Sequence, residues 1–298
     1  MNFVNTWAAI FNPGDAPDCY FDQIAHRPFP EPLDAYSPVN AWWLSEVSRL
    51  VYRLEGNEVG GRATGRTRGQ ILSDVGLKES LFVDAGGSQA AVVEPLDAGS
   101  NPFVVIAFRG TDTLLDWLDF NVDLAPVRWE AGGKVHRGFK EAFDAVWNRL
   151  EPARRPGVPL IFTGHSLGGA LATLAASRQA PTSTYTFGSP RVGDAVFGAT
   201  VPRQAFFRIV NNRDLVTDVP TLLEHVGSLR YIAHDGRIVA DPDESTIRAD
   251  RTRRDPSFDR RPDLVDKLTG PPQELADHAP VNYVAHLERA VSGSGTRD

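Results

Sequence analysis

The sequence of 298 residues contains one cysteine, Cys19, and has a formal net charge of −7. A single cysteine excludes an intrachain disulfide, and it excludes zinc sites that need two or more cysteines from one chain. It is compatible with a reducing compartment. Because there is no basic excess to neutralise phosphates, nucleic acid is not expected as a partner. No metal and no cofactor are expected.

Long uninterrupted apolar segments are also missing. No run approaches about eighteen residues, so we expect no transmembrane segment, and any contact with lipid has to be made from the surface. The chain starts MNFVNTWAAIFNPGD, without a basic n-region or an apolar run of signal-peptide length before Asn12 and Pro13. We therefore predict a cytoplasmic protein. Export by a route that needs no signal peptide is the alternative.

What the chain does contain is an alternation of strand-like and helix-like segments. Trp43, Val47 and Leu54 belong to one apolar stripe at helical spacing, and a second helical stripe covers Gly138–Leu150. Strands that alternate with helices indicate a mainly parallel central sheet with helices on both faces. The short apolar runs that predict strands are Gln89–Glu94, Pro102–Phe108, Leu160–Thr163, Ser183–Phe187 and Ala205–Val210.

The remaining segments fit one α/β domain over residues 1–298. Residues 1–36 show no clear period and are predicted to be an irregular lead-in. Leu229–Val239 predicts a hairpin around Asp235-Gly236. Residues 241–270 interleave arginine with aspartate, and we interpret them as a charged surface insertion that forms a solvated loop.

The strongest local pattern is Gly-His-Ser-Leu-Gly at residues 164–168, between an apolar strand and an alanine-rich helix. A sharp strand-to-helix turn exposes the hydroxyl of Ser166, and Gly164 and Gly168 avoid collisions with neighbouring elements. This pattern predicts a nucleophilic serine. We expect His165 to pack or orient the turn, because neighbouring side chains in such a turn point apart.

A serine nucleophile needs a histidine base and a carboxylate that fixes the histidine tautomer. In α/β-hydrolases both follow the serine along the chain, the acid first. His278 lies in a loop before the last helix and is the favoured base, with His286 behind it. Asp214 follows an apolar strand and is the favoured acid, ahead of Asp218.

Two further residues are candidates for an oxyanion hole. Thr111 stands at the abrupt end of the strand Pro102–Phe108 and offers a backbone N–H and a hydroxyl. Leu167 follows the nucleophile and offers a second backbone N–H. Asp194, in contrast, is expected to cap a helix over residues 195–199.

Taken together, these segments resemble the class 3 lipase family, the fungal-lipase-like α/β-hydrolases, from about residue 100 to 287. The resemblance implies the α/β-hydrolase fold, with Ser166 as nucleophile, Asp214 as acid, His278 as base and Thr111 in the oxyanion hole. The motifs that carry it are AFRGTDTLLDWLDFNVDL, KVHRGFKEAF, TGHSLGGALATLAA, TFGSPRVGD, FRIVNNRDLVTDVP and DHAPVNYV.

The same resemblance places a lid after FRGT, where the candidates are Leu114, Leu115, Trp117 and Leu118. Such a segment either covers the active site in water and opens on lipid, or anchors a fixed helix.

The sequence therefore predicts a carboxylic-ester hydrolase, most similar to triacylglycerol lipases, that cleaves acyl esters of lipids through an acyl-enzyme. We expect an acyl-ester or lipid substrate and transient contact with a lipid surface. The alternatives are a phospholipase A1-type, membrane-active hydrolase and a catalytically silent scaffold that binds a ligand or partner.

Overall fold

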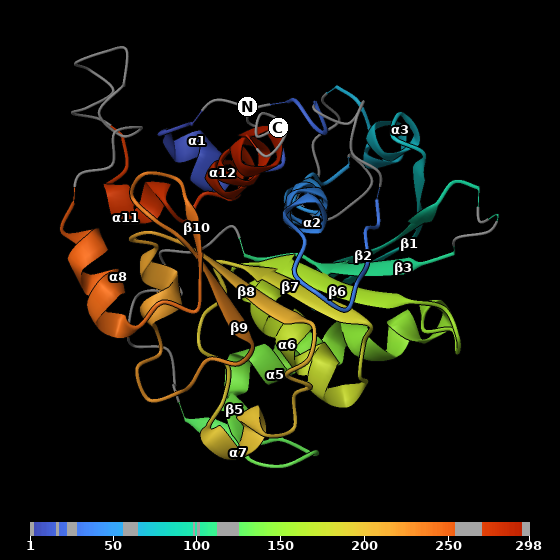
Figure 1. Cartoon of the computed structure of the whole chain (residues 1–298). Coiled ribbons are helices and arrows are strands. Elements are labelled where there is room, and N and C mark those ends of the chain that lie inside the picture. Colours follow the sequence, from blue (N-terminus) through green and yellow to red (C-terminus); the bar gives the residue numbers. More distant parts are fainter. Residues whose placement is uncertain are drawn as a thin grey trace.

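The computed structural model describes residues 3–15, 18–22, 29–55, 65–97, 99, 102–111, 125–253 and 270–293. Within these residues an eight-stranded sheet forms the centre of the molecule (Figure 1). Its strands run in the spatial order β1-β2-β3-β6-β7-β8-β9-β10. Their bounds are β1 Leu77–Ala85, β2 Ser88–Pro95, β3 Val104–Phe108, β6 Leu160–His165, β7 Ser183–Phe187, β8 Phe206–Asn211, β9 Ser228–Ile232 and β10 Ile238–Ala240.

The middle of this sheet is parallel, as the sequence predicts. The strands β3, β6, β7, β8 and β9 pair in parallel, while β1, β2 and β10 add antiparallel edges. Since the carboxyl ends of parallel strands meet at one edge of a sheet, the loops that follow β3, β6 and β8 come together there. A separate pair consists of β4 Pro126–Arg128 and β5 Lys134–His136.

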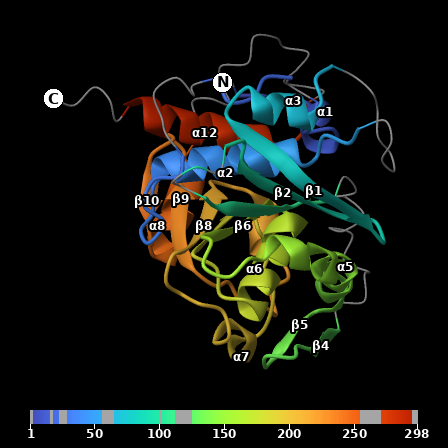
Figure 2. The ribbon, with the colours of Figure 1, turned by 90° about the vertical axis from the view of Figure 1, so that its right-hand side faces the viewer.

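Helices cover both faces of the sheet, which also agrees with the prediction. On one face lie α2 and α12, which run side by side in both views (Figures 1 and 2). On the other face lie α5 and α6. The helix bounds are α1 Trp7–Phe11, α2 Pro38–Leu50, α3 Arg68–Ser73, α5 Arg137–Trp147, α6 Leu167–Arg178, α7 Ala195–Gly198, α8 Glu244–Arg251, α11 Gln273–Ala276 and α12 Pro280–Gly293, with 3₁₀ turns η2 Asn148–Ala153 and η3 Leu215–Asp218.

Alternation along the strands produces a hydrophobic core on each face. On β3, Val105 and Ala107 face α2, while Ile106 and Phe108 face α5 and α6. This period of two explains why the run over β3 is continuously apolar, since both faces are covered. The predicted Leu229–Val239 hairpin is present as β9 and β10.

Three parts of the chain differ from the predictions. The strand β1 was not predicted, and the lead-in contains the short helix α1. The prediction of a solvated loop over 241–270 is wrong for Glu244–Arg251, which form α8. Asp243 caps this helix, because its side chain accepts a hydrogen bond from Thr246 N–H at 2.7 Å. Residues 254–269 lie outside the described residues.

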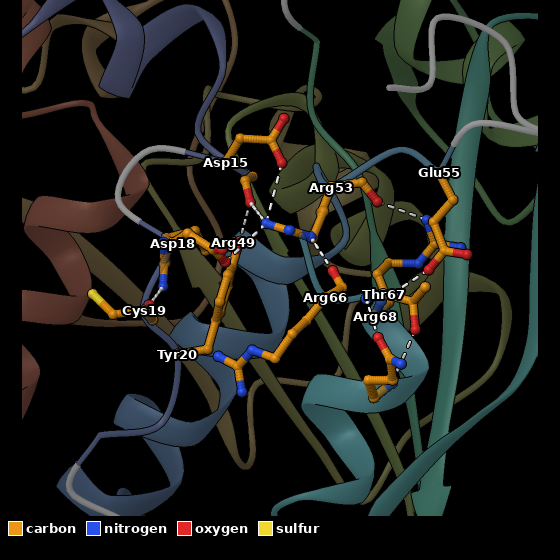
Figure 3. A network of polar contacts seen from close by, with 12 residues as sticks. Asp15, Asp18, Cys19, Tyr20, Arg49, Arg53, Glu55, Arg66, Thr67 and Arg68 are labelled. Atoms are coloured by element: carbon orange, nitrogen blue, oxygen red, sulfur yellow. Dashed lines mark hydrogen bonds and ion pairs between the residues drawn. The ribbon is translucent and has the colours of Figure 1, made fainter. Parts of the chain in front are cut away.

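Buried arginines tie the N-terminal segment to the body of the protein (Figure 3). Arg53, just after α2, lies 3.1 Å from the carboxylates of Asp15 and Asp18. Its Nε donates to the carbonyl of Arg66 at 2.7 Å, and its own carbonyl accepts from Arg68 at 2.6 Å. The N-terminal segment is therefore held against α2 by hydrogen bonds that sequence periodicity does not reveal.

Candidate active site

Ser166 occupies the turn between β6 and α6, at the carboxyl edge of the parallel strands. Its backbone has φ 59° and ψ −128°, a left-handed conformation that a serine rarely adopts. Such a residue costs about 1–3 kcal/mol and persists only where its surroundings enforce it. Hydrogen bonds do so here, since Ser166 N–H donates to Phe187 O at 2.9 Å and Ser166 O accepts from Gly169 N–H at 2.9 Å.

The glycines on either side of Ser166 are needed for close backbone packing. A Cβ at Gly164 would collide with the backbone of Gly168, and a Cβ at Gly168 would collide with the carbonyl of Phe108 on β3. The turn is thus as tight as the sequence pattern requires.

Asp214 and His278 meet as a hydrogen-bonded pair. Nδ1 of His278 lies 2.9 Å from both carboxylate oxygens of Asp214, and both side chains are buried. A carboxylate only accepts hydrogen bonds, so Nδ1 carries the proton and Nε2 is left as the basic nitrogen. The loop after β8 and the loop before α12 supply the two residues, as the sequence predicts.

Two more donors hold the carboxylate of Asp214, which is 0% exposed. Val216 N–H donates to Oδ1 at 3.0 Å, and the hydroxyl of Tyr283 on α12 donates to Oδ2 at 2.6 Å. The same hydroxyl accepts from Asn211 N–H at 3.0 Å. Burial, and then the charge of Asp214, raises the pKa of Tyr283 well above its ordinary value, so this phenol stays protonated.

His165 connects the nucleophile turn to the loop of His278. Its Nε2 lies 2.7 Å from the carbonyl of His278, so Nε2 donates and Nδ1 is the acceptor. The hydroxyl of Tyr52 then donates to Nδ1 at 3.0 Å. Burial, and next the nearby His278, holds the pKa of His165 well below its usual range, so the ring is neutral. These contacts agree with the predicted packing and orienting role.

The contact between these two rings also places His278 close to the nucleophile turn. The ring centroids of His165 and His278 lie 4.5 Å apart, and Ser166 directly follows His165 in the chain.

The runner-up residues lie in other surroundings. Asp218 is half exposed and pairs with Arg251 at 2.8 Å. His286 packs its ring against Phe3 at 4.3 Å, and burial lowers its pKa to about 3. Asp194 caps α7, as predicted, by accepting from Phe197 N–H at 2.9 Å.

The two predicted oxyanion residues flank the turn of Ser166. Thr111 is half-buried beyond β3, which pairs in parallel with β6 up to Gly164. Leu167 is the first residue of α6, and the first N–H groups of a helix have no intrahelical partner. Both therefore lie at the edge where Ser166 lies. The lid candidates Leu114, Leu115, Trp117 and Leu118 fall outside the described residues.

Tyr283 and Tyr52 are the site residues that sequence reasoning missed. Tyr283 lies five positions after His278, on the first turns of α12, where it could have been recognised as a residue facing the acid. Tyr52 is separated from His165 by 113 positions, and no local pattern links them.

No described helix is both long and apolar enough to cross a membrane.

Comparisons with known proteins find similarity to lipases and to a phospholipase. The model of the family described as lipase (class 3) matches residues 105–224. The secreted mono- and diacylglycerol lipase 1 of Fusarium solani is 35% identical over 133 residues, which cover 40% of this chain and 40% of that protein. A chloroplastic phospholipase A(1) of Arabidopsis thaliana is 33% identical over 149 residues, which cover 39% of this chain and 33% of that protein.

A solved structure shows the same fold over a longer stretch. The lipase from Rhizopus microsporus var. chinensis superposes with a TM-score of 0.52 at 23% identity, over 72% of this chain and 82% of that one. The chain thus has the α/β-hydrolase fold. The match to the Fusarium solani protein spans only 40% of that relative's length.

Proposed function

We propose that the chain belongs to the class 3 lipase family, whose model matches residues 105–224, and that it is a carboxylic-ester hydrolase that cleaves acyl esters of lipids. Ser166 is the nucleophile, His278 the general base and Asp214 the residue that orients the base. The observation that carries the proposal is the buried pair of His278 and Asp214, in which Nδ1 faces the carboxylate, so that Nε2 is the ring nitrogen available to the turn of Ser166.

In the acylation step the hydroxyl of Ser166 attacks the ester carbonyl carbon. Its proton passes to Nε2 of His278, and the carboxylate of Asp214 stabilises the imidazolium through Nδ1. The negative charge that develops on the carbonyl oxygen is stabilised by N–H groups of Thr111 and Leu167 and by the positive end of α6. When the C–O bond breaks, His278 returns its proton to the departing alcohol, and the acyl group stays on Ser166.

In the deacylation step water takes the place of the alcohol. His278 accepts a proton from the water, which attacks the acyl carbonyl carbon. The tetrahedral intermediate collapses, His278 protonates the oxygen of Ser166, and the fatty acid leaves. The hydrogen bonds to Asp214 from Val216 and Tyr283 keep the carboxylate in place through both steps.

Two relatives support two substrate classes for this site. The Fusarium solani relative is named a mono- and diacylglycerol lipase, and the Arabidopsis relative is named a phospholipase A(1). We propose neutral acylglycerols as the first class, and phospholipids cleaved at an acyl ester as the second.

The test is hydrolysis of p-nitrophenyl esters of increasing chain length, alongside triacylglycerol and phosphatidylcholine. Ser166→Ala should lower every activity by several orders of magnitude and should abolish labelling by a fluorophosphonate. Ser183→Ala is the matched control, because Ser183 is a buried serine on β7 whose hydroxyl has no hydrogen-bond partner among the described residues. Near-full activity in a folded Ser166→Ala protein would disprove the assignment.

A further inference from the structure

A cavity of about 390 Å³ lies at the edge of the sheet, and its lining includes neither Asp214 nor His278. Its walls come from β8, β9, the turn η3 and the helix α8, which lies beside β9 and β10 in Figure 1. The volume is within the range of pockets that bind small molecules, which begins at about 300 Å³.

The wall formed by α8 is anchored in place. Oδ2 of Asp250 accepts hydrogen bonds from the hydroxyl of Tyr231 at 3.0 Å, from His234 N–H at 2.9 Å and from the amide of Asn212 at 2.9 Å. Ile247 adds an apolar contact to the small cluster around Tyr231. One wall of the cavity is therefore a helix that specific contacts hold in place.

Two arginines that line the cavity have no carboxylate partner among the described residues. The guanidinium of Arg208, on β8, makes no hydrogen bond or ion pair with them, and its Nε is buried. The guanidinium of Arg191, which follows β7, donates within the described part of the chain only to the carbonyl of Leu223 at 3.3 Å, and its Nε is buried as well. Burial and the nearby charge of Arg191 lower the pKa of Arg208 to about 10.

The carboxylates of the same cavity are already paired with other arginines. Asp218 lies 2.8 Å from Arg251, and Glu244 lies 3.6 Å from Arg248. His225 donates from Nε2 to Thr217 O at 2.7 Å, and burial followed by the charge of Arg208 holds its pKa well below the ordinary value, so it is neutral. The described lining thus keeps two uncompensated positive charges, in a chain whose net charge is −7.

A cation that is kept from water without a partner is costly, and the cost disappears when an anion binds. Guanidinium groups bind carboxylates and phosphates by paired hydrogen bonds. A phosphate monoester carries about −1.5 to −2 charges near neutral pH, which matches two free arginines better than one carboxylate does. The cavity also has room for a small organic group beside the phosphate.

We propose that this cavity is a binding site for a phosphate monoester, held by Arg208 and Arg191. The site is separate from the proposed ester hydrolysis, and none of its arginines belongs to the proposed catalytic machinery. Arg208 supplies one guanidinium from β8, on the sheet, and Arg191 supplies the second from the segment that follows β7.

The first experiment measures binding of inorganic phosphate to the whole protein by titration calorimetry at constant ionic strength, with acetate as the carboxylate probe. We expect saturable binding of phosphate and at least tenfold weaker binding of acetate. Arg208→Gln and Arg191→Gln should each weaken phosphate binding at least tenfold. Arg203→Gln, which removes an exposed arginine outside the cavity, should leave it unchanged.

The melting temperature separates a ligand site from a structural role. If Arg208 serves to bind a ligand, Arg208→Gln should have the same melting temperature in phosphate-free buffer as the unmodified protein, or a higher one. Added phosphate should raise the melting temperature of the unmodified protein but not that of the variant. If Arg208 is structural, the variant melts lower in both buffers, and the proposal is wrong. Arg208→Lys, which keeps the charge but not the fork of donors, provides a second variant with intermediate binding.

Glycerol 3-phosphate and vesicles that contain phosphatidic acid identify the source of the phosphate. Binding of glycerol 3-phosphate alone assigns the site to a soluble molecule. Vesicle binding that Arg208→Gln abolishes assigns it to a lipid headgroup. An equal affinity for acetate and phosphate, or phosphate binding that survives both arginine variants, overturns the proposal. Ester hydrolysis should be unaffected by these variants, so a failure here leaves the proposed function intact.

Discussion

Replacing Tyr283 with phenylalanine removes one oxygen atom from behind the candidate acid. That oxygen accepts from Asn211 N–H at 3.0 Å and donates to Oδ2 of Asp214 at 2.6 Å. A buried N–H without a partner costs about 1–3 kcal/mol, and a lost hydrogen bond to a charged group costs about 1.5–3 kcal/mol. Native domains have free energies of unfolding of about 5–15 kcal/mol. A loss near the lower end of the two ranges above leaves most of that free energy, so we expect a folded but less stable protein.

The rate of hydrolysis reports on the acid more specifically than the free energy of unfolding does. Without the hydroxyl of Tyr283, the carboxylate of Asp214 keeps Val216 N–H and Nδ1 of His278 as partners but loses the tyrosine donor on Oδ2. The carboxylate can then turn away from Nδ1, and the base is positioned less well. Since a small misplacement of a catalytic group lowers the rate by up to about 100-fold, kcat should fall by about 10–100-fold.

Tyr185→Phe is the matched control for this experiment. The hydroxyl of Tyr185 accepts from Ser37 N–H at 3.2 Å and donates to Ala35 O at 3.4 Å, both of them backbone groups. This variant should lose stability without lowering kcat. The two variants are compared by urea unfolding and by kcat for p-nitrophenyl ester hydrolysis. Equal kcat values for the two would refute the role assigned to Tyr283.

Two further predictions concern buried histidines. His165→Phe removes two hydrogen bonds, the one from the hydroxyl of Tyr52 to Nδ1 and the one from Nε2 to the carbonyl of His278. Displacement of the base should then lower kcat by roughly 10–100-fold. His286→Phe, a replacement outside the site, should not lower kcat, and equal kcat values for the two variants would contradict the positioning role. Burial keeps the pKa of His165 and His225 well below the ordinary value and lowers that of His286 to about 3, so these groups bind protons in the unfolded chain before they do in the folded one. The free energy of unfolding therefore decreases as pH falls below about 6.5, by up to about 1.4 kcal/mol per pH unit for each histidine. In urea unfolding between pH 6 and 4, the free energy of unfolding of His286→Phe should fall less steeply with pH by that amount. An unchanged slope would disprove the reasoning.

The sequence could predict those parts of the site that depend on neighbouring residues. The strand, the turn at Ser166 and the helix α6 are encoded within about twenty positions, and the structure contains all three where expected. The pairing of Asp214 with His278 depends on strand order and on a loop 64 positions away. Chain order narrowed the choice, and the family motifs selected these two residues over Asp218 and His286.

The elements that were missed have weak local signals. The strand β1 carries Lys78, Glu79 and Asp84, and only Leu77 and Val83 are fully buried along it, so neither alternation nor an apolar run marks it. The helix α8 contains a single large apolar residue, Ile247. Its position depends on Asp250 reaching Tyr231 and His234, which are contacts between distant parts of the chain.

The place of α12 in the chain has a consequence for protein synthesis. Tyr283, Val284 and Leu287 of α12 complete the core that α2 begins, and the amide of Asn282 binds both the N–H and the carbonyl of Val4. The ribosome makes Ser166 and Asp214 before it makes His278 and α12. Until α12 has emerged, a nascent chain has an uncovered apolar face beside α2 and no base next to its nucleophile. The ester hydrolase proposed here should thus stay inactive during translation, at a stage when its exposed apolar face invites binding by chaperones.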